Sequence, residues 1–275
     1  MSQTWDDEER PEKLRIGPAG WARVAVRGSV MGTVVFGGLG LLLLTRLVER
    51  PVFKMRRPVT PWITQGVCKL SLRIMRLPVH VRGQQMTDHG AIVANHSSWL
   101  DIFVLNSLKN IYFVSKSEVA GWPGIGWLAR ATGTVFIRRD RREAKAQTAL
   151  FAERLHHGHK LLFFPEGTST DGLRVLPFKT TLFASFFEDP LKDEIQLQAV
   201  TVIYSAPHDQ DARFYGWWGD MDFGTHLLKT LSAKHQGKVE VIYHDPVRVN
   251  AFSDRKAIAQ HLEAQVRDAH HLKIE

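Results

Sequence analysis

A histidine and an aspartate lie five residues apart directly after an apolar run, and together they could perform proton transfer. The run is residues 91–95, and His96 and Asp101 follow it. Their side chains can meet if His96 sits in a loop and Asp101 lies about one turn inside the helix that follows. The carboxylate would then accept from one imidazole nitrogen and leave the other free to remove a proton. This is the base half of a catalytic triad without a protein nucleophile, so a substrate hydroxyl would attack.

The spacing of this pair alone has two interpretations. The chain has thirteen histidines, so one such pair arises by chance at roughly even odds. The structural alternative is a buried, hydrogen-bonded His96 and an Asp101 that favours a first helical turn because of the helix dipole. Other parts of the sequence must decide between the two.

Two further strand ends carry side chains suited to substrate binding. Residues 161–168 form a predicted buried strand that runs into a Pro-Glu-Gly-Thr turn, where backbone amides or Glu166 could hold a polar group. Residues 133–139 form a predicted strand with two arginines at its end, and arginine suits a two-point grip on phosphate or carboxylate. The alternatives are a solvated Glu166 and a nucleic-acid patch over 138–142, which no recognition motif accompanies.

These segments must be positioned by a core of alternating strands and helices. The chain from 79 to 275 is predicted to be one α/β domain with a mixed, largely buried sheet flanked by helices. Its predicted strands are 79–82, 91–95, 111–115, 133–137, 160–164, 197–204 and 239–243. Its clearest predicted helices are 98–108, 141–157, 178–188 and 254–270.

The first 78 residues are predicted to hold the protein on a membrane. Residues 1–22 are interpreted as a flexible polar tail, and residues 23–78 as membrane-associated helices. Residues 28–45 carry no charge and are just long enough to span a bilayer. Their glycines would also suit a segment that dips into one leaflet, and a buried core helix is the soluble alternative. More Lys and Arg follow this run than precede it, so a spanning helix would leave the main domain in the cytoplasm. The expected location is a bacterial inner membrane.

A second N-terminal helix is predicted over residues 60–77. Its apolar residues recur at helical spacing, and Lys69, Arg73 and Arg76 form a basic stripe. The stripe is typical of an interfacial helix whose cations face anionic headgroups. An ordinary surface helix with snorkelling side chains would show the same pattern.

Composition restricts the partners. The chain has 275 residues with 44% hydrophobic and 23% charged residues, as in globular proteins. A net charge of +8 favours an anionic partner such as nucleic acid, a membrane surface or an acidic carrier protein. The single cysteine, Cys68, excludes an internal disulfide and a cysteine-rich zinc site. The histidines around Gly158 and at 270–271 are explained by helix ends, so no metal site is predicted.

Taken together, these blocks resemble the lysophosphatidate acyltransferases (1-acylglycerol-3-phosphate O-acyltransferases) over about residues 80–205. The motif N-H-x-S-x-x-D is matched from Asn95 to Asp101, G-x-x-F-I-x-R from Gly133 to Arg139, and F-P-E-G-T by residues 164–168. The resemblance implies an enzyme that moves a fatty acyl chain from a thioester to a lysolipid hydroxyl, with His96 as base and Asp101 as its partner. It implies substrate-binding roles for Asn95, Ser98, Arg139, Glu166, Gly167, Thr168 and Lys179. Neither a metal nor another cofactor is implied, and the donor would be acyl carrier protein or coenzyme A.

One departure from the family pattern bears on the acceptor. Family members that act on lysophosphatidate commonly carry arginine after F-P-E-G-T, where this chain has Ser169. Losing that cation would remove a charge-assisted hydrogen bond worth roughly 1.5–3 kcal/mol, which Lys179 could partly replace. Ala199 also stands where the family's fourth motif has proline. The segment 166–172 is most similar to the branch that acylates lyso-ornithine and related lyso-aminolipids, so that acceptor is predicted, with lysophosphatidate as the alternative.

Overall fold

The computed structural model describes residues 5–6, 14–137 and 144–274. Arg139, predicted to bind substrate, lies outside these residues. The strands are β1 (Val79–Arg82), β2 (Gly90–Ala94), β3 (Tyr112–Lys116), β4 (Val135–Ile137), β5 (Leu161–Phe163), β6 (Gln196–Ser205), β7 (Lys238–Tyr243) and β8 (Val247–Arg248). The α-helices are α1 (Pro18–Phe53), α2 (Thr60–Met75), α3 (Leu100–Leu108), α4 (Ile125–Thr132), α5 (Ala144–His156), α6 (Leu191–Glu194), α7 (Phe223–Ser232) and α8 (Arg255–Ile274). Short 3-10 helices are η1 (Ser117–Gly121), η3 (Thr180–Phe187) and η4 (Val249–Ala251).

The described strands form one mixed sheet in the order β1-β7-β6-β2-β5-β3-β4, with β8 beside β6. The central strands β6, β2, β5, β3 and β4 pair in parallel, whereas β7 and β8 are antiparallel to β6. Parallel strands present their C-terminal ends at one edge, so the loops after β2 and β5 leave the sheet side by side. The mixed, largely buried sheet predicted from the sequence is confirmed.

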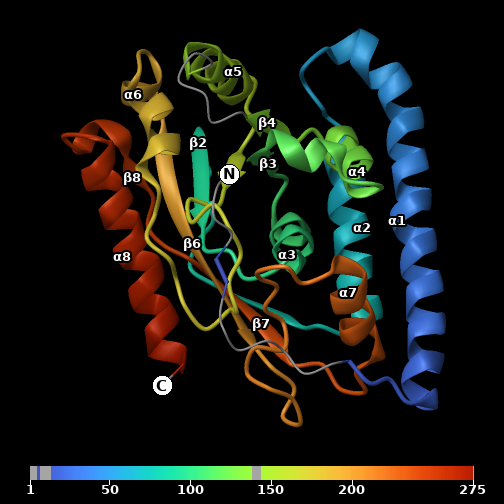
Figure 1. Cartoon of the computed structure of the whole chain (residues 1–275). Helices are drawn as coiled ribbons and strands as arrows, with labels where there is room; N and C mark the ends of the chain where they lie inside the picture. The colour runs from blue at the N-terminus through green and yellow to red at the C-terminus, as the bar shows by residue number, and fades with distance from the viewer. Residues whose placement is uncertain (1–4, 7–13, 138–143, 275) are drawn as a thin grey trace.

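Both faces of the sheet are covered, and β2 shows how. All five residues of β2 are buried. Ala91 and Val93 point into a core shared with α5, η3 and α8, while Ile92 and Ala94 point into a core shared with α1, α2, α3 and α7. A strand buried on both faces has a continuous apolar sequence, which is why residues 91–95 could be predicted as a strand. Figure 1 shows α8 on one side of the sheet and α1 on the far side of the other layer.

The predicted strands agree with the structure to within about two residues, but three helical predictions need correction. The stretch 178–188 is the 3-10 helix η3. Helices α4 and α7 were not predicted. The helix α1 begins at Pro18, four residues before the predicted end of the polar tail at residue 22. Proline fits the first turn of a helix because its missing N–H has no partner there in any case.

The glycine-rich run 28–45 does not turn back on itself. It lies inside α1, which continues without a break for 36 residues. Gly38 lets α1 approach α2 closely, because an added Cβ would collide with Val67. The helix is long and apolar enough to cross a membrane, and only 11% of its most apolar window is buried. In its exposure the helix differs from the soluble alternative, a buried core helix, and it is consistent with a membrane anchor.

Candidate active site

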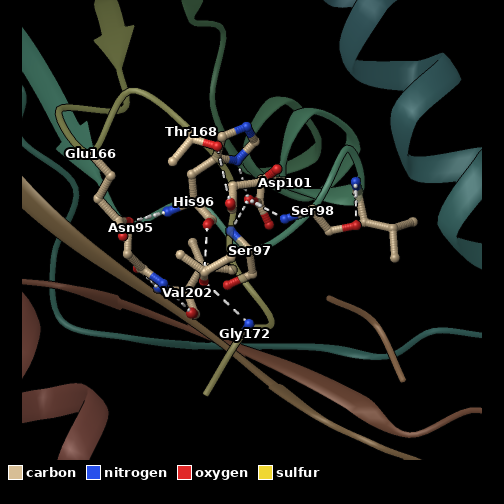
Figure 2. A network of polar contacts seen from close by, with 12 residues as sticks. Asn95, His96, Ser97, Ser98, Asp101, Glu166, Thr168, Gly172 and Val202 are labelled. Carbon is tan, nitrogen blue, oxygen red and sulfur yellow. Dashed lines mark hydrogen bonds and ion pairs between the residues drawn. The ribbon is translucent and has the colours of Figure 1, made fainter. Parts of the chain in front are cut away.

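His96 and Asp101 meet in the geometry that their spacing required. His96 lies in the loop after β2, and Asp101 is the second residue of α3. The distance from His96 Nδ1 to Asp101 Oδ2 is 2.7 Å (Figure 2). Because the carboxylate accepts a hydrogen bond from Nδ1, the imidazole presents its Nε2 as the basic nitrogen.

Asp101 is locked in place by four donors. Its Oδ2 accepts from His96 and from the backbone N–H groups of Ser97 (2.9 Å) and Ser98 (3.0 Å), and its Oδ1 accepts from the Tyr204 hydroxyl (2.7 Å). The carboxylate is completely buried. Burial and the charge of Asp101 raise the pKa of Tyr204 well above its usual value, so the phenol remains a donor. A fully bonded carboxylate cannot rotate away from the imidazole, which fixes the direction of Nε2.

The base lies on the wall of an apolar cavity. The cavity has a volume of about 650 Å³ and is lined mainly by α1, α2, α3, α4 and α7, with His96 among the lining residues. The imidazole stacks on the Phe164 ring with 4.0 Å between centroids and 11° between planes. The His96 side chain remains 19% exposed. A volume within the usual 300–1,000 Å³ range for ligand sites, with apolar walls and one base, suits an apolar chain whose reactive end reaches His96.

Glu166 supports this base from behind. Its Oε1 accepts from the His96 backbone N–H at 2.6 Å, and its Oε2 accepts from the Leu176 N–H at 2.7 Å. The residue is 1% exposed. Burial raises the pKa of Glu166 to about 8. The hydrogen bonds from the Leu176 and His96 N–H groups favour the charged form and only partly offset this rise. Glu166 therefore joins the turn after β5 to the loop after β2, and its oxygens are occupied by the protein.

Asn95 and Ser98, both predicted to bind substrate, bond to the protein in this structure. The Asn95 amide donates to the Val202 carbonyl (2.8 Å) and accepts from the Val202 N–H (2.7 Å), which ties the end of β2 to β6. The Ser98 hydroxyl accepts from the Leu100 N–H at the start of α3 (3.3 Å). Both side chains are fully buried, so they position the His96 loop.

Gly167 and Thr168 form the rim of the turn after β5. Gly167 adopts φ +74°, a conformation that favours glycine, and its N–H bonds to the Phe164 carbonyl (3.0 Å). The Thr168 hydroxyl donates to the Ser169 carbonyl (3.2 Å) and accepts from the Trp5 N–H (3.4 Å). Figure 2 shows Thr168 beside the His96 ring. Gly167 and Thr168 are both partly exposed, and Thr168 lies beside the base.

Lys179 lies just before η3, exposed, and its N–H bonds to the Pro165 carbonyl (2.9 Å). This bond holds the Lys179 backbone against the same turn that carries Glu166. Ser169 is 8% exposed, so the position where relatives of the lysophosphatidate type commonly carry arginine is largely covered here.

Two residues at the site were not predicted from the sequence. Tyr204 reaches Asp101 from β6 across 103 positions, and only its place in a β-rich run could have drawn attention to it. Trp5 packs against Trp218 with 6.3 Å between ring centroids and lies under the Arg174 guanidinium at 4.8 Å. Trp5 therefore contacts the turn at Thr168, which the prediction of a polar tail gave no reason to expect.

No group of three metal-binding side chains occurs within residues 5–6, 14–137 and 144–274. The side chains of the site offer proton transfer by His96, oriented by Asp101, beside an apolar cavity.

Comparison with known proteins identifies the class that this fold and site define. The Acyltransferase family model matches residues 78–204. The chain is 56% identical over 263 residues to the lyso-ornithine lipid O-acyltransferase of Rhodobacter capsulatus, covering 96% of this chain and 95% of that protein. The chain belongs to this acyltransferase family, and it is an acyltransferase.

A more distant relative supports the assignment, and a solved structure shares the fold. The lyso-ornithine lipid O-acyltransferase of Pseudomonas aeruginosa is 33% identical over 249 residues, covering 89% of this chain and 92% of that protein. The crystal structure of the 1-acyl-sn-glycerophosphate acyltransferase from Thermotoga maritima shares the fold, with a TM-score of 0.61, 21% identity and 92% coverage of both chains. The resemblance stated from the sequence motifs is confirmed.

Proposed function

We propose that this acyltransferase transfers a fatty acyl chain from a thioester to the hydroxyl of a lyso-ornithine lipid, with His96 as the general base. The observation that carries the proposal is the His96–Asp101 pair on the wall of the apolar cavity. The cavity can hold an acyl chain, and the imidazole stands where a hydroxyl meeting that chain would lose its proton.

The proton-transfer step uses residues already in position. As the acceptor hydroxyl attacks the thioester carbonyl, His96 Nε2 takes its proton, and Asp101 stabilises the imidazolium that results. The collapse of the tetrahedral intermediate expels the thiolate, which the imidazolium can protonate. The stack of His96 on Phe164 keeps the ring plane fixed through both transfers.

The acceptor assignment rests on two supports. The near full-length relatives carry the name lyso-ornithine lipid O-acyltransferase. In addition, Ser169 supplies no cation at the place where a lysophosphatidate site commonly has one, and an aminolipid headgroup carries less negative charge than a phosphate monoester. We place this headgroup beside Gly167, Thr168 and Lys179, with Arg139 as a further contact.

We further propose that α1 holds the enzyme on the cytoplasmic face of the inner membrane. Large apolar side chains on α1 are exposed to more than half of their full extent, namely Phe36, Leu41, Leu43, Leu44, Leu47 and Val48. Such a surface is stable in lipid and unfavourable in water. The arginines that follow the run favour the cytoplasmic side. A Ser253→Cys variant, exposed on the main domain, should resist an impermeant thiol reagent in intact cells and react after lysis.

One assay tests the choice of acceptor and the choice of acyl donor together. The purified enzyme is offered lyso-ornithine lipid or lysophosphatidate, each with acyl carrier protein or coenzyme A thioesters. We expect preference for lyso-ornithine lipid, and the two donors will compete for the same site. A clear preference for lysophosphatidate would overturn the proposed acceptor while leaving the chemistry of His96 intact.

A further inference from the structure

A second hollow lies away from His96, where the first turns of α1 meet the ends of α2 and α7. Its volume is about 590 Å³. Five cationic side chains line it: Arg23, Arg27, Arg73, Arg76 and Lys234. Figure 1 shows these three helix ends close together at the end of α1 that follows the N-terminal segment.

Among the residues that the structure describes, the cations in this hollow have no acidic partner. Within the described ranges, no ion pair joins any of the five to a carboxylate. Arg27 is only 8% exposed, and its Nη1 donates to the carbonyls of Leu231 (2.9 Å) and Ala233 (2.7 Å). Arg23 and Arg76 are close enough to Arg27 for their positive charges to repel it. Like charges gathered without a counter-charge form a site for an anion.

The backbone of Arg76 has a conformation that is uncommon for residues other than glycine. Arg76 caps the C-terminus of α2 with φ +61°, in the left-handed region. Glycine is favoured there because it has no Cβ. Arg76 therefore brings a cation to the hollow at a backbone position that glycine would occupy more easily.

The apolar part of the lining identifies the kind of anion. Val26 and Val30 also line the hollow, and they are 66% and 47% exposed on α1, the apolar helix. An anion bound here would have apolar surface beside it along the same helix. We propose that the hollow binds the phosphate of an anionic phospholipid, with the acyl chains of that lipid along the exposed face of α1.

This site goes beyond the proposed reaction, because the bound lipid would not be a substrate. It would nevertheless touch the active site indirectly. Arg27 bonds to the carbonyl of Leu231, whose side chain lines the acyl cavity together with Met31 of α1. A lipid that fixes Arg27 would hold α1 against α7 and so hold two walls of that cavity together.

The test measures binding rather than acyl transfer, so its outcome is independent of the proposed function. Full-length protein in neutral detergent micelles is immobilised, and retention of radiolabelled phosphatidylglycerol is measured against its mole fraction in the micelle. Two variants remove cations from the hollow, Arg73→Gln and Arg76→Gly. Lys69→Gln is the matched control, because Lys69 is exposed on α2 and does not line the hollow.

We expect each arginine variant to weaken phosphatidylglycerol retention about fivefold, and the double variant about 25-fold. Lys69→Gln should match the parent. Arg76→Gly should fold at least as stably as the parent, because glycine suits the backbone there, so its loss of binding cannot be attributed to unfolding.

Three results would overturn the proposal. The first is equal retention of phosphatidylglycerol by the parent and the double variant. The second is equal retention of phosphatidylglycerol and phosphatidylcholine by the parent, which would show that the hollow does not distinguish lipids by their net charge. The third is competition by an acidic acyl carrier protein that is lost in the arginine variants while lipid retention is unchanged, which would assign the hollow to a protein partner.

Discussion

The carboxyl group of Glu166 offers a sharp test of how the base is held. In Glu166→Gln the side-chain shape is retained, but one of its two oxygens becomes an NH2 group. That group would face either the His96 N–H or the Leu176 N–H, which now lie 2.6 and 2.7 Å from carboxyl oxygens. A buried donor left without an acceptor costs about 1–3 kcal/mol.

The expected loss of stability is measurable by thermal unfolding. For a chain of this size, 1 kcal/mol corresponds to about 2–4 °C in Tm, so Glu166→Gln should unfold about 2–12 °C below the parent at pH 5, and the difference should shrink as the pH rises. Its kcat should fall, because the backbone of His96 loses its anchor. The KM for the acceptor should change little, since the Glu166 oxygens are occupied by the protein.

The direction of the pKa shift of Glu166 determines how the stability of the protein changes with pH. Burial raises this pKa to about 8, from 4.5 when exposed. Between these values the folded state binds one proton more than the unfolded state, so the parent loses stability as pH rises, by up to about 1.4 kcal/mol per unit. Glu166→Gln lacks this titration, and its unfolding free energy should fall less steeply between pH 5 and 8.

The opposite pattern would refute this reasoning. If Glu166 binds the acceptor directly, Glu166→Gln should raise the acceptor KM and leave both Tm and the slope with pH unchanged. Glu166→Ala is not a useful control, because it also opens a cavity in a buried position.

Three other substitutions test separate parts of the site. Tyr204→Phe removes a buried donor to Asp101 and should destabilise the fold by about 1.5–3 kcal/mol and lower kcat with KM retained; unchanged kcat would contradict its positioning role. Gly32→Leu projects into open space on the cavity wall and should shift donor preference to shorter chains, whereas Gly37→Leu, outside the cavity, should not. Trp5→Ala should raise the acceptor KM several-fold at constant kcat; an unchanged KM would separate the N-terminal segment from acceptor binding.

The sequence was most informative where structure is local. The run 91–95 is buried on both faces of the sheet and therefore apolar throughout, and the strand-loop-helix order around it placed His96 and Asp101 correctly. The helical spacing of apolar residues in α2 could also be recognised in the sequence. The tertiary environment of this helix could not, because Trp62 and Leu70 share the exposed side with the basic stripe, while Cys68, Leu72 and Met75 face the core.

Contacts between distant segments could not be read from the sequence. The bond from Tyr204 to Asp101 depends on the parallel pairing of β2 with β6. Glu166 was predicted to bind substrate, and its bond to the backbone of the His96 loop was not foreseen. Helix α7 has only ten residues and no long periodic pattern, so its role in walling the cavity emerged only from packing.

The most direct test of the central claim is acyl transfer by a His96→Ala variant of the full-length enzyme. Radiolabelled acyl thioester and lyso-ornithine lipid are supplied, and the acylated product is quantified beside a Tm measurement that confirms folding. We expect the rate to fall by about 10²–10⁴-fold, the usual contribution of a general base, with the Tm close to that of the parent. Transfer at the parental rate by a folded His96→Ala variant would contradict the assignment of His96 as the base.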